Sequence, residues 1–195
     1  GGFIIVRISK QFGGRVEPIS ICSLSRSRYI FWLNCIVDSS LSFFLGTCYF
    51  PPLGDSCYDE EGLLHPHKAL GHDLGILKNI NNNIVLVGDF NGRIGTTEDI
   101  SEKGCYGDGD HDGLRSCGDG VLFRARQSAD VKVNQLGRLL VSNMNASDMC
   151  ILNGLCGEES EGFTCHKWNG QSVVDYCIVS RHLFPAEEGV GGSVE

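Results

Sequence analysis

The chain has 195 residues, of which 42% are hydrophobic and 21% are charged, and its formal net charge is −8 at pH 7. This length suits one globular domain or a large part of one. The acidic balance argues against a broad basic groove for nucleic acid, but it leaves open an enzyme that meets phosphate through a bound metal ion. No apolar run approaches the ~20 residues that a membrane-spanning helix needs, so no membrane association is expected.

The ten cysteines are scattered along the chain, and several stand inside apolar runs, as Cys48, Cys150 and Cys177 do. A buried free cysteine behaves as a small hydrophobe, so this usage predicts a reducing, intracellular compartment. No CxxC pair occurs, and the neighbours Cys165 and His166 form a lone pair of candidate ligands. A structural zinc site therefore has weak support.

Three strands are predicted in the first quarter of the chain. Residues 1–8 form an apolar run behind a glycine pair, and residues 29–37 and 41–50 are two strongly apolar runs around a short polar turn. The last two runs predict a β-hairpin. Two prolines follow the second run, which puts Tyr49 at a strand end, where ordinary strand packing is the alternative to a functional role.

A helix is predicted over residues 68–80. Its leucines recur at helical spacing, Ile80 continues their stripe, and Pro66 lies just upstream, where proline is tolerated at a helix start. The helix delivers the chain to a further strand, so the order strand, helix, strand predicts a layered α/β (α+β) architecture.

That further strand opens the segment NNNIVLVGDFNGRIG, residues 81–95. The β-branched and aliphatic residues 84–87 predict a fully buried strand, and Asp89 and Asn91 follow almost at once. A rigid strand that ends in an acid and an amide is a common way to build a site. The alternative is that both residues are turn formers.

Residues 96–120 are rich in glycine and acids and predict a long exposed acidic loop, which in a compact domain is usually functional or disordered. Within it, DGDHDG at 108–113 resembles the opening of a calcium loop, with Asp119 at the twelfth position, where glutamate is usual. A solvated acidic loop is the alternative. Residues 185–195 have no pattern and predict an unstructured tail.

The C-terminal part predicts a helix with Asn134 as its N-cap and Asn145 as its stop, followed by a buried strand at 150–152. A hairpin with its turn at Asn169-Gly170 and a return strand over residues 172–180 comes next.

Asp175 lies inside that apolar return strand. A carboxylate there is costly unless it is paired. The alternative is that it faces outward on a one-sided strand, with Val173 on the same face.

Five segments occur in one order: LGTCYFPP, GDFNGRIG, RQSADVKVNQLGRLL, ILNG and GFTCHKWNGQSVVDYCIVS. Together they resemble the endonuclease/exonuclease/phosphatase family, and most closely the apurinic-type endonuclease domain of LINE-type (non-LTR) retrotransposons. The resemblance runs from about residue 1 to residue 183. It implies a two-sheet β-sandwich flanked by helices, and metal-assisted hydrolysis of phosphodiesters in DNA with Mg²⁺ or Mn²⁺, in the nucleus.

The resemblance also implies residue roles. Asp89 would orient or deprotonate the attacking water and take an indirect part in the metal site. Asn91 would hold the phosphate and its transition state, and Tyr49 would hydrogen-bond a phosphate oxygen. Asp175 would orient a catalytic histidine.

Substrate contacts are implied for Thr164 and Asn153. The family's metal-binding glutamate would precede residue 1, and its Ser-Asp-His segment would follow the last strand. His182 is too close to Asp175 to replace that histidine. We therefore expect residues 1–184 to be a domain that is incomplete at its N- and C-termini and inactive or weakly active. Alternatives are a non-catalytic remnant or binding module and a phosphatase of the same superfamily.

Overall fold

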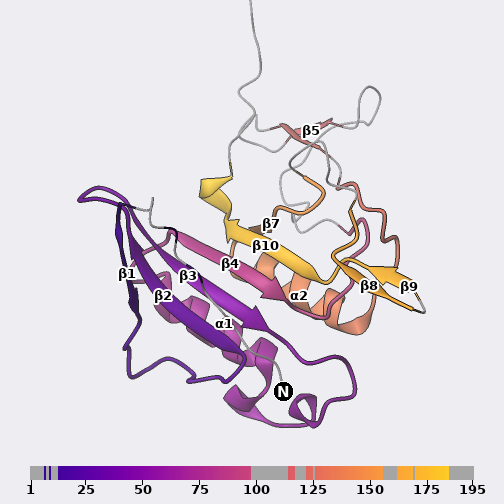
Figure 1. Cartoon of the computed structure of the whole chain (residues 1–195), viewed down its shortest axis with the longest axis horizontal. Coiled ribbons are helices and arrows are strands. Elements are labelled where there is room, and N and C mark those ends of the chain that lie inside the picture. The colour runs from indigo at the N-terminus through magenta and orange to yellow at the C-terminus, as the bar shows by residue number, and fades with distance from the viewer. Residues whose placement is uncertain are drawn as a thin grey trace, which may run out of the picture.

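In a computed structural model, the described residues are 7, 9, 13–97, 114–116, 122–124, 126–155, 162–168 and 170–184. They form a six-stranded sheet in the order β1-β2-β3-β4-β10-β7 and two two-stranded sheets, β5-β6 and β8-β9 (Figure 1). With helices packed on the large sheet, the predicted α/β class is confirmed. The bounds of the strands are β1 Arg15–Pro18, β2 Ile30–Ile36, β3 Ser42–Tyr49, β4 Ile84–Asp89, β5 Leu114–Ser116, β6 Leu122–Arg124, β7 Met149–Ile151, β8 Cys165–Lys167, β9 Gly170–Ser172 and β10 Asp175–Ser180. The bounds of the helices are α1 Pro66–Leu77 and α2 Gln135–Ala146, with 3-10 turns η1 Ser56–Tyr58, η2 Gly62–Leu64 and η3 Arg181–Leu183.

The predicted hairpin is β2 and β3, which pair antiparallel from Ile30 opposite Cys48 to Ile36 opposite Ser42. The turn between them is fixed by Asp38, whose Oδ1 accepts hydrogen bonds from Ser40 N at 2.7 Å and Leu41 N at 3.0 Å. Local turn chemistry therefore sets the register of this pair.

Strand β4 lies inside the sheet, parallel to β3 and antiparallel to β10. Ile84 and Leu86 are fully buried, but Val85 and Val87 on the other face are only half-buried. The prediction of a fully buried strand is thus wrong for one face. The reason is that α1 and α2 both pack on the face of Ile84 and Leu86, behind the sheet in Figure 1.

Helix α1 begins at Pro66, two residues before the predicted start, and it ends at Leu77, three residues before the predicted end. Ile80 does not continue the buried stripe, because it follows the last turn and is 59% exposed. Helix α2 has the predicted N-cap, since Asn134 Oδ1 accepts a hydrogen bond from Gly137 N at 2.7 Å.

The predicted strand over residues 172–180 is divided into β9 and β10. Between them, Val173 N donates to Asp130 Oδ2 at 2.9 Å and Val174 O accepts from Phe90 N at 2.9 Å. These partners take the backbone groups that a continuous ladder would use. The β8-β9 turn is also one residue earlier than predicted, because Lys167 pairs with Gly170.

Several predictions fall wholly or mainly outside the described residues: the strand at 1–8, the acids of the calcium-like segment and the tail at 185–195. Within the predicted acidic loop, the described residues 114–116 form β5 rather than loop. No disulfide joins the cysteines of the described parts, among which Cys48 and Cys150 are buried and Cys177 is half-buried. None of the helices in the described ranges has the length and apolar character to cross a membrane.

Candidate functional site

Three strand ends meet at one edge of the sheet. Strands β3 and β4 are parallel, so both finish there, and the antiparallel β10 begins there (Figure 1). The register places Tyr49 opposite Asp89, and Asp89 opposite Asp175. Residues directly opposite on paired strands share a face, so these three side chains form a strand-end row. This face is opposite to the one that α1 and α2 cover.

Asp89 is half-buried, and its Oδ1 accepts a hydrogen bond from Asn91 N at 2.8 Å. Burial, with the charge of Asp175 adding to it, raises the pKa of Asp89 above its usual value. The bond from Asn91 and the charge of Lys167 oppose the rise. Two facing carboxylates repel, which costs stability unless a cation or a proton lies between them. Such perturbed acids cluster at functional sites.

Asn91 is held in the left-handed backbone region, with φ 47°. Its side-chain Nδ2 donates a hydrogen bond to Phe50 O at 2.7 Å, and its backbone carbonyl oxygen accepts one from Asn134 Nδ2 at 3.2 Å. An amide nitrogen carries two N–H groups, so one remains for a ligand. The loops after β3 and β4 and the cap of α2 therefore fix Asn91 beside Asp89.

Tyr49 is half-buried at the end of β3, where its backbone N donates to Tyr29 O at 3.0 Å. Among the described residues its hydroxyl has no hydrogen-bond partner. The hydroxyl is thus available to a ligand at the row.

Thr164 and Asn153 hold the backbone around Asp175. Thr164 Oγ1 accepts from Val174 N at 3.0 Å and Asp175 N at 3.1 Å. Asn153 Nδ2 donates to Asp175 O at 3.1 Å, and its Oδ1 accepts from Cys177 N at 2.9 Å. Both residues position the start of β10, and their contact with substrate stays a prediction.

His182 lies at the far end of β10, where its ring nitrogens contact Asn82 Nδ2 at 3.2 Å and Asn83 Oδ1 at 2.9 Å. These asparagines precede β4, so His182 is at the opposite edge of the sheet from Asp175, as its sequence spacing indicated. Within the parts of the chain that the structure describes, no histidine is hydrogen-bonded to Asp175.

The donor chemistry of the row fits a hard divalent cation, because Mg²⁺ prefers one or two carboxylates and completes its shell with water and substrate oxygens. Asp89 and Asp175 are the candidate ligands. No group of three or more histidine, cysteine or acidic side chains suited to a metal occurs among the described residues. An ion here would therefore depend on water and substrate for its other ligands.

The sequence matches no protein-family model and no curated protein. Among solved structures, the chain is similar to the endonuclease domain of TRAS1, a telomere-specific non-LTR retrotransposon, with 13% identity and a TM-score of 0.48. The alignment covers 89% of this chain, which spans 57% of the length of that one. A likeness of this degree decides neither the function nor the role of any residue.

Two residues of the β8-β9 hairpin were not predicted as site residues. Trp168 is 98% exposed at the turn, and the neighbouring ammonium of Lys167 acts on the pKa of Asp89. Figure 1 shows this hairpin beside the start of β10. The sequence signal that could have identified them is the segment HKWNG, in which a cationic and an aromatic residue stand next to a turn.

The ion pair between Arg93 and Asp130 was also missed, because its members are 37 residues apart. Asp130 is 2% exposed and accepts hydrogen bonds from Arg93 Nε at 2.8 Å and Val173 N at 2.9 Å. Burial alone would raise the pKa of Asp130, but these bonds outweigh it and lower the pKa. The pair ties the loop after β4 to the segment before β10, on both sides of the strand-end row.

Proposed function

We propose that the strand-end row hydrolyses phosphodiester bonds in DNA with the help of a divalent cation. The observation that carries the proposal is the register that brings Asp89 and Asp175 side by side, next to Tyr49. The sequence motifs that contain these residues support DNA as the substrate. An enzyme that nicks chromosomal DNA acts in the nucleus.

Each residue has a chemical task. Asp89 orients the attacking water and accepts its proton. The Tyr49 hydroxyl and the Asn91 amide donate hydrogen bonds to the phosphoryl oxygens, on which negative charge grows. Mg²⁺ or Mn²⁺ held by Asp89 and Asp175 would neutralise part of this charge and lower the pKa of a bound water.

The β8-β9 hairpin supplies the contact with DNA. Lys167 offers its ammonium to a backbone phosphate, and the exposed ring of Trp168 offers a stacking surface to a base. A DNA strand is long enough to contact Lys167, Trp168 and the strand-end row at the same time. This favours DNA over a small inositol phosphate as the substrate.

We expect slow turnover from this chain, because the described residues contain neither a histidine bonded to Asp175 nor a third metal ligand. Members of a catalytic set act as a unit, so a missing one costs much of the rate. The same observation favours the second candidate function, which is DNA binding without cleavage.

A plasmid-nicking assay in Mg²⁺ tests the proposal on the full chain. We expect slow nicking that falls at least ~100-fold in Asp89→Asn, the usual size of a lost general base. Asp59→Asn, which removes an exposed carboxylate after η1, is the matched control and should leave the rate unchanged. Equal nicking by Asp89→Asn would refute the proposal. DNA binding without any nicking would favour the second candidate.

A further inference from the structure

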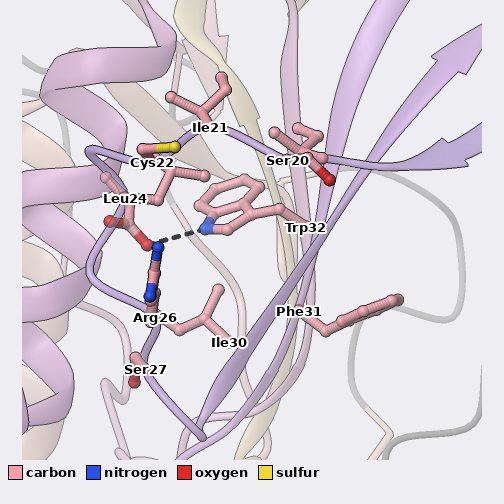
Figure 2. A pocket seen from close by; sticks show the side chains of 11 residues that line it. Ser20, Ile21, Cys22, Leu24, Arg26, Ser27, Ile30, Phe31 and Trp32 are labelled. Atoms are coloured by element: carbon pink, nitrogen blue, oxygen red, sulfur yellow. Dashed lines mark hydrogen bonds between the residues drawn. The ribbon is translucent and has the colours of Figure 1, made fainter.

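A cavity of about 340 Å³ opens between the segment before β2, β2 itself and α1. None of the three residues of the strand-end row lines it. Apolar side chains form most of its wall, among them Ile19, Ile21, Leu24, Ile30 and Trp32. Figure 2 shows Ile21 and Leu24 gathered around the indole of Trp32. Size and lining match those of small-molecule sites.

The polar group of this cavity is Asp73. It lies on the inner face of α1 and is 1% exposed, yet it lines the cavity. Its oxygens accept hydrogen bonds from Ser25 N at 2.7 Å, Ser25 Oγ at 2.9 Å and Trp32 Nε1 at 2.9 Å. Figure 2 shows the Trp32 bond as a dashed line.

Among the described residues, the carboxylate of Asp73 has no counter-ion. All its donors are neutral, and none of the ion pairs among the described residues includes it. A buried carboxylate without a cation is costly. An ionised carboxylate also has about four acceptor sites, so three bonds leave one unused.

We propose that this cavity binds a small organic cation, a protonated primary or secondary amine with an apolar body. The ammonium group donates to the free acceptor site of Asp73 and neutralises its charge. The apolar body packs against Ile21 and Leu24.

Arg26 limits what fits. It is the cationic side chain among the labelled residues that line the cavity in Figure 2. Arg26 is exposed. Its guanidinium makes no ion pair with Asp73 within 4.0 Å. It therefore repels a second cation near the opening, which favours ligands with one charge. The net charge of −8 favours cations over anions at longer range.

Fluorescence of Trp32 tests the proposal on the full chain. The sequence has two tryptophans, so Trp168→Phe leaves Trp32 as the single reporter. Phenethylamine is the probe at pH 7.5, with phenethyl alcohol and phenylacetate as neutral and anionic analogues. We expect a saturable change with phenethylamine and affinities at least ~10-fold weaker for both analogues, the factor that about 1.4 kcal/mol represents.

Asp73→Asn removes the charge and keeps an acceptor oxygen, and it should weaken amine binding at least ~10-fold. Asp59→Asn is the matched control and should bind as the parent does.

Arg26→Ala should tighten binding, because it removes the repelling charge. Ile21→Phe fills the cavity without adding a second tryptophan and without touching Asp73, and it should abolish binding, which keeps the test decisive if Asp73→Asn does not fold. Equal affinity for the alcohol, unchanged binding by Ile21→Phe, or no saturable change would overturn the proposal and leave Asp73 as a tie between Ser25 and Trp32.

Discussion

Asp89 and Asp175 face each other across two hydrogen-bonded strands, so the charge of Asp175 acts on Asp89. The negative charge of Asp175 raises the pKa of Asp89, and the positive charge of Lys167 lowers it, both beside the larger effect of burial. The acidity of the proposed base is thus controlled by residues that stand far from it in the sequence.

We predict that Asp175→Asn lowers the pKa of Asp89 and that Lys167→Ala raises it. The carboxyl resonance of Asp89, followed by NMR as a function of pH, measures both shifts. Lys68→Ala, which removes an exposed lysine on α1, serves as the control and should leave the titration unchanged. A pKa of Asp89 that does not respond to Asp175→Asn would mean that the two carboxylates do not face each other.

A second prediction at this scale concerns His67, which is 3% exposed and packs its ring 4.9 Å from that of Phe50. Neither of its ring nitrogens has a hydrogen-bond partner among the described residues. Burial, with a smaller effect of His65, lowers the pKa of His67 from 6.5 to about 4. The unfolded chain therefore takes up this proton first. The contribution of neutral His67 to the free energy of unfolding is fully present above pH 6.5. It is lost as the pH falls towards 4, and the loss is on the order of 3 kcal/mol.

Urea unfolding at pH 7.5, 6 and 5 checks this loss. We expect His67→Leu, which keeps an apolar group against Phe50, to lose less stability over this range than the parent. Parallel losses in both proteins would contradict the prediction.

Among the elements, the pair β3-β4 depends on close backbone approach at Gly88. Gly88 has φ 142°, and a Cβ there would lie 2.0 Å from Cys48 O on β3. We predict that Gly88→Ala costs about 3 kcal/mol or more, because the strain and the clash both act on the strand that carries Asp89.

Gly75→Ala is the matched control within α1, where a Cβ meets nothing within 4 Å. It should stabilise the chain by ~0.5–1 kcal/mol, since alanine favours helix interiors over glycine. Urea unfolding measures both variants. A small effect of Gly88→Ala would show that β3 and β4 can separate at this end without cost.

At the scale of the whole molecule, a net charge of −8 opposes association with DNA. We predict that affinity for duplex DNA in Mg²⁺ exceeds that in EDTA at least ~10-fold, because the cation offsets this repulsion. Fluorescence anisotropy of a labelled duplex at fixed ionic strength measures the ratio. Trp168→Ala should weaken binding in Mg²⁺, whereas Lys68→Ala should not. Equal binding in EDTA would place the DNA contact away from the carboxylates.

The sequence by itself determined the elements whose causes are local. The β2-β3 hairpin follows from two apolar runs around a polar turn, and the start of α2 follows from the N-cap Asn134. The apolar run before Gly88 and the turn formers after it are enough to name Asp89 and Asn91 as candidate site residues, although β4 itself continues to Asp89. Each of these patterns acts over a few residues, which makes it readable from the chain alone.

Only the tertiary structure decided which residues meet. Strand pairing joins Asp89 to Asp175 across 86 positions of the sequence, and no local pattern encodes that register. The face of β4 that is buried depends on where the helices pack, and the division of residues 172–180 depends on backbone bonds to Asp130 and Phe90. The charge of Asp73 has consequence only because folding encloses it in an apolar cavity. Burial, register and electrostatic environment arise from contacts between distant segments, and for that reason folding alone could set them.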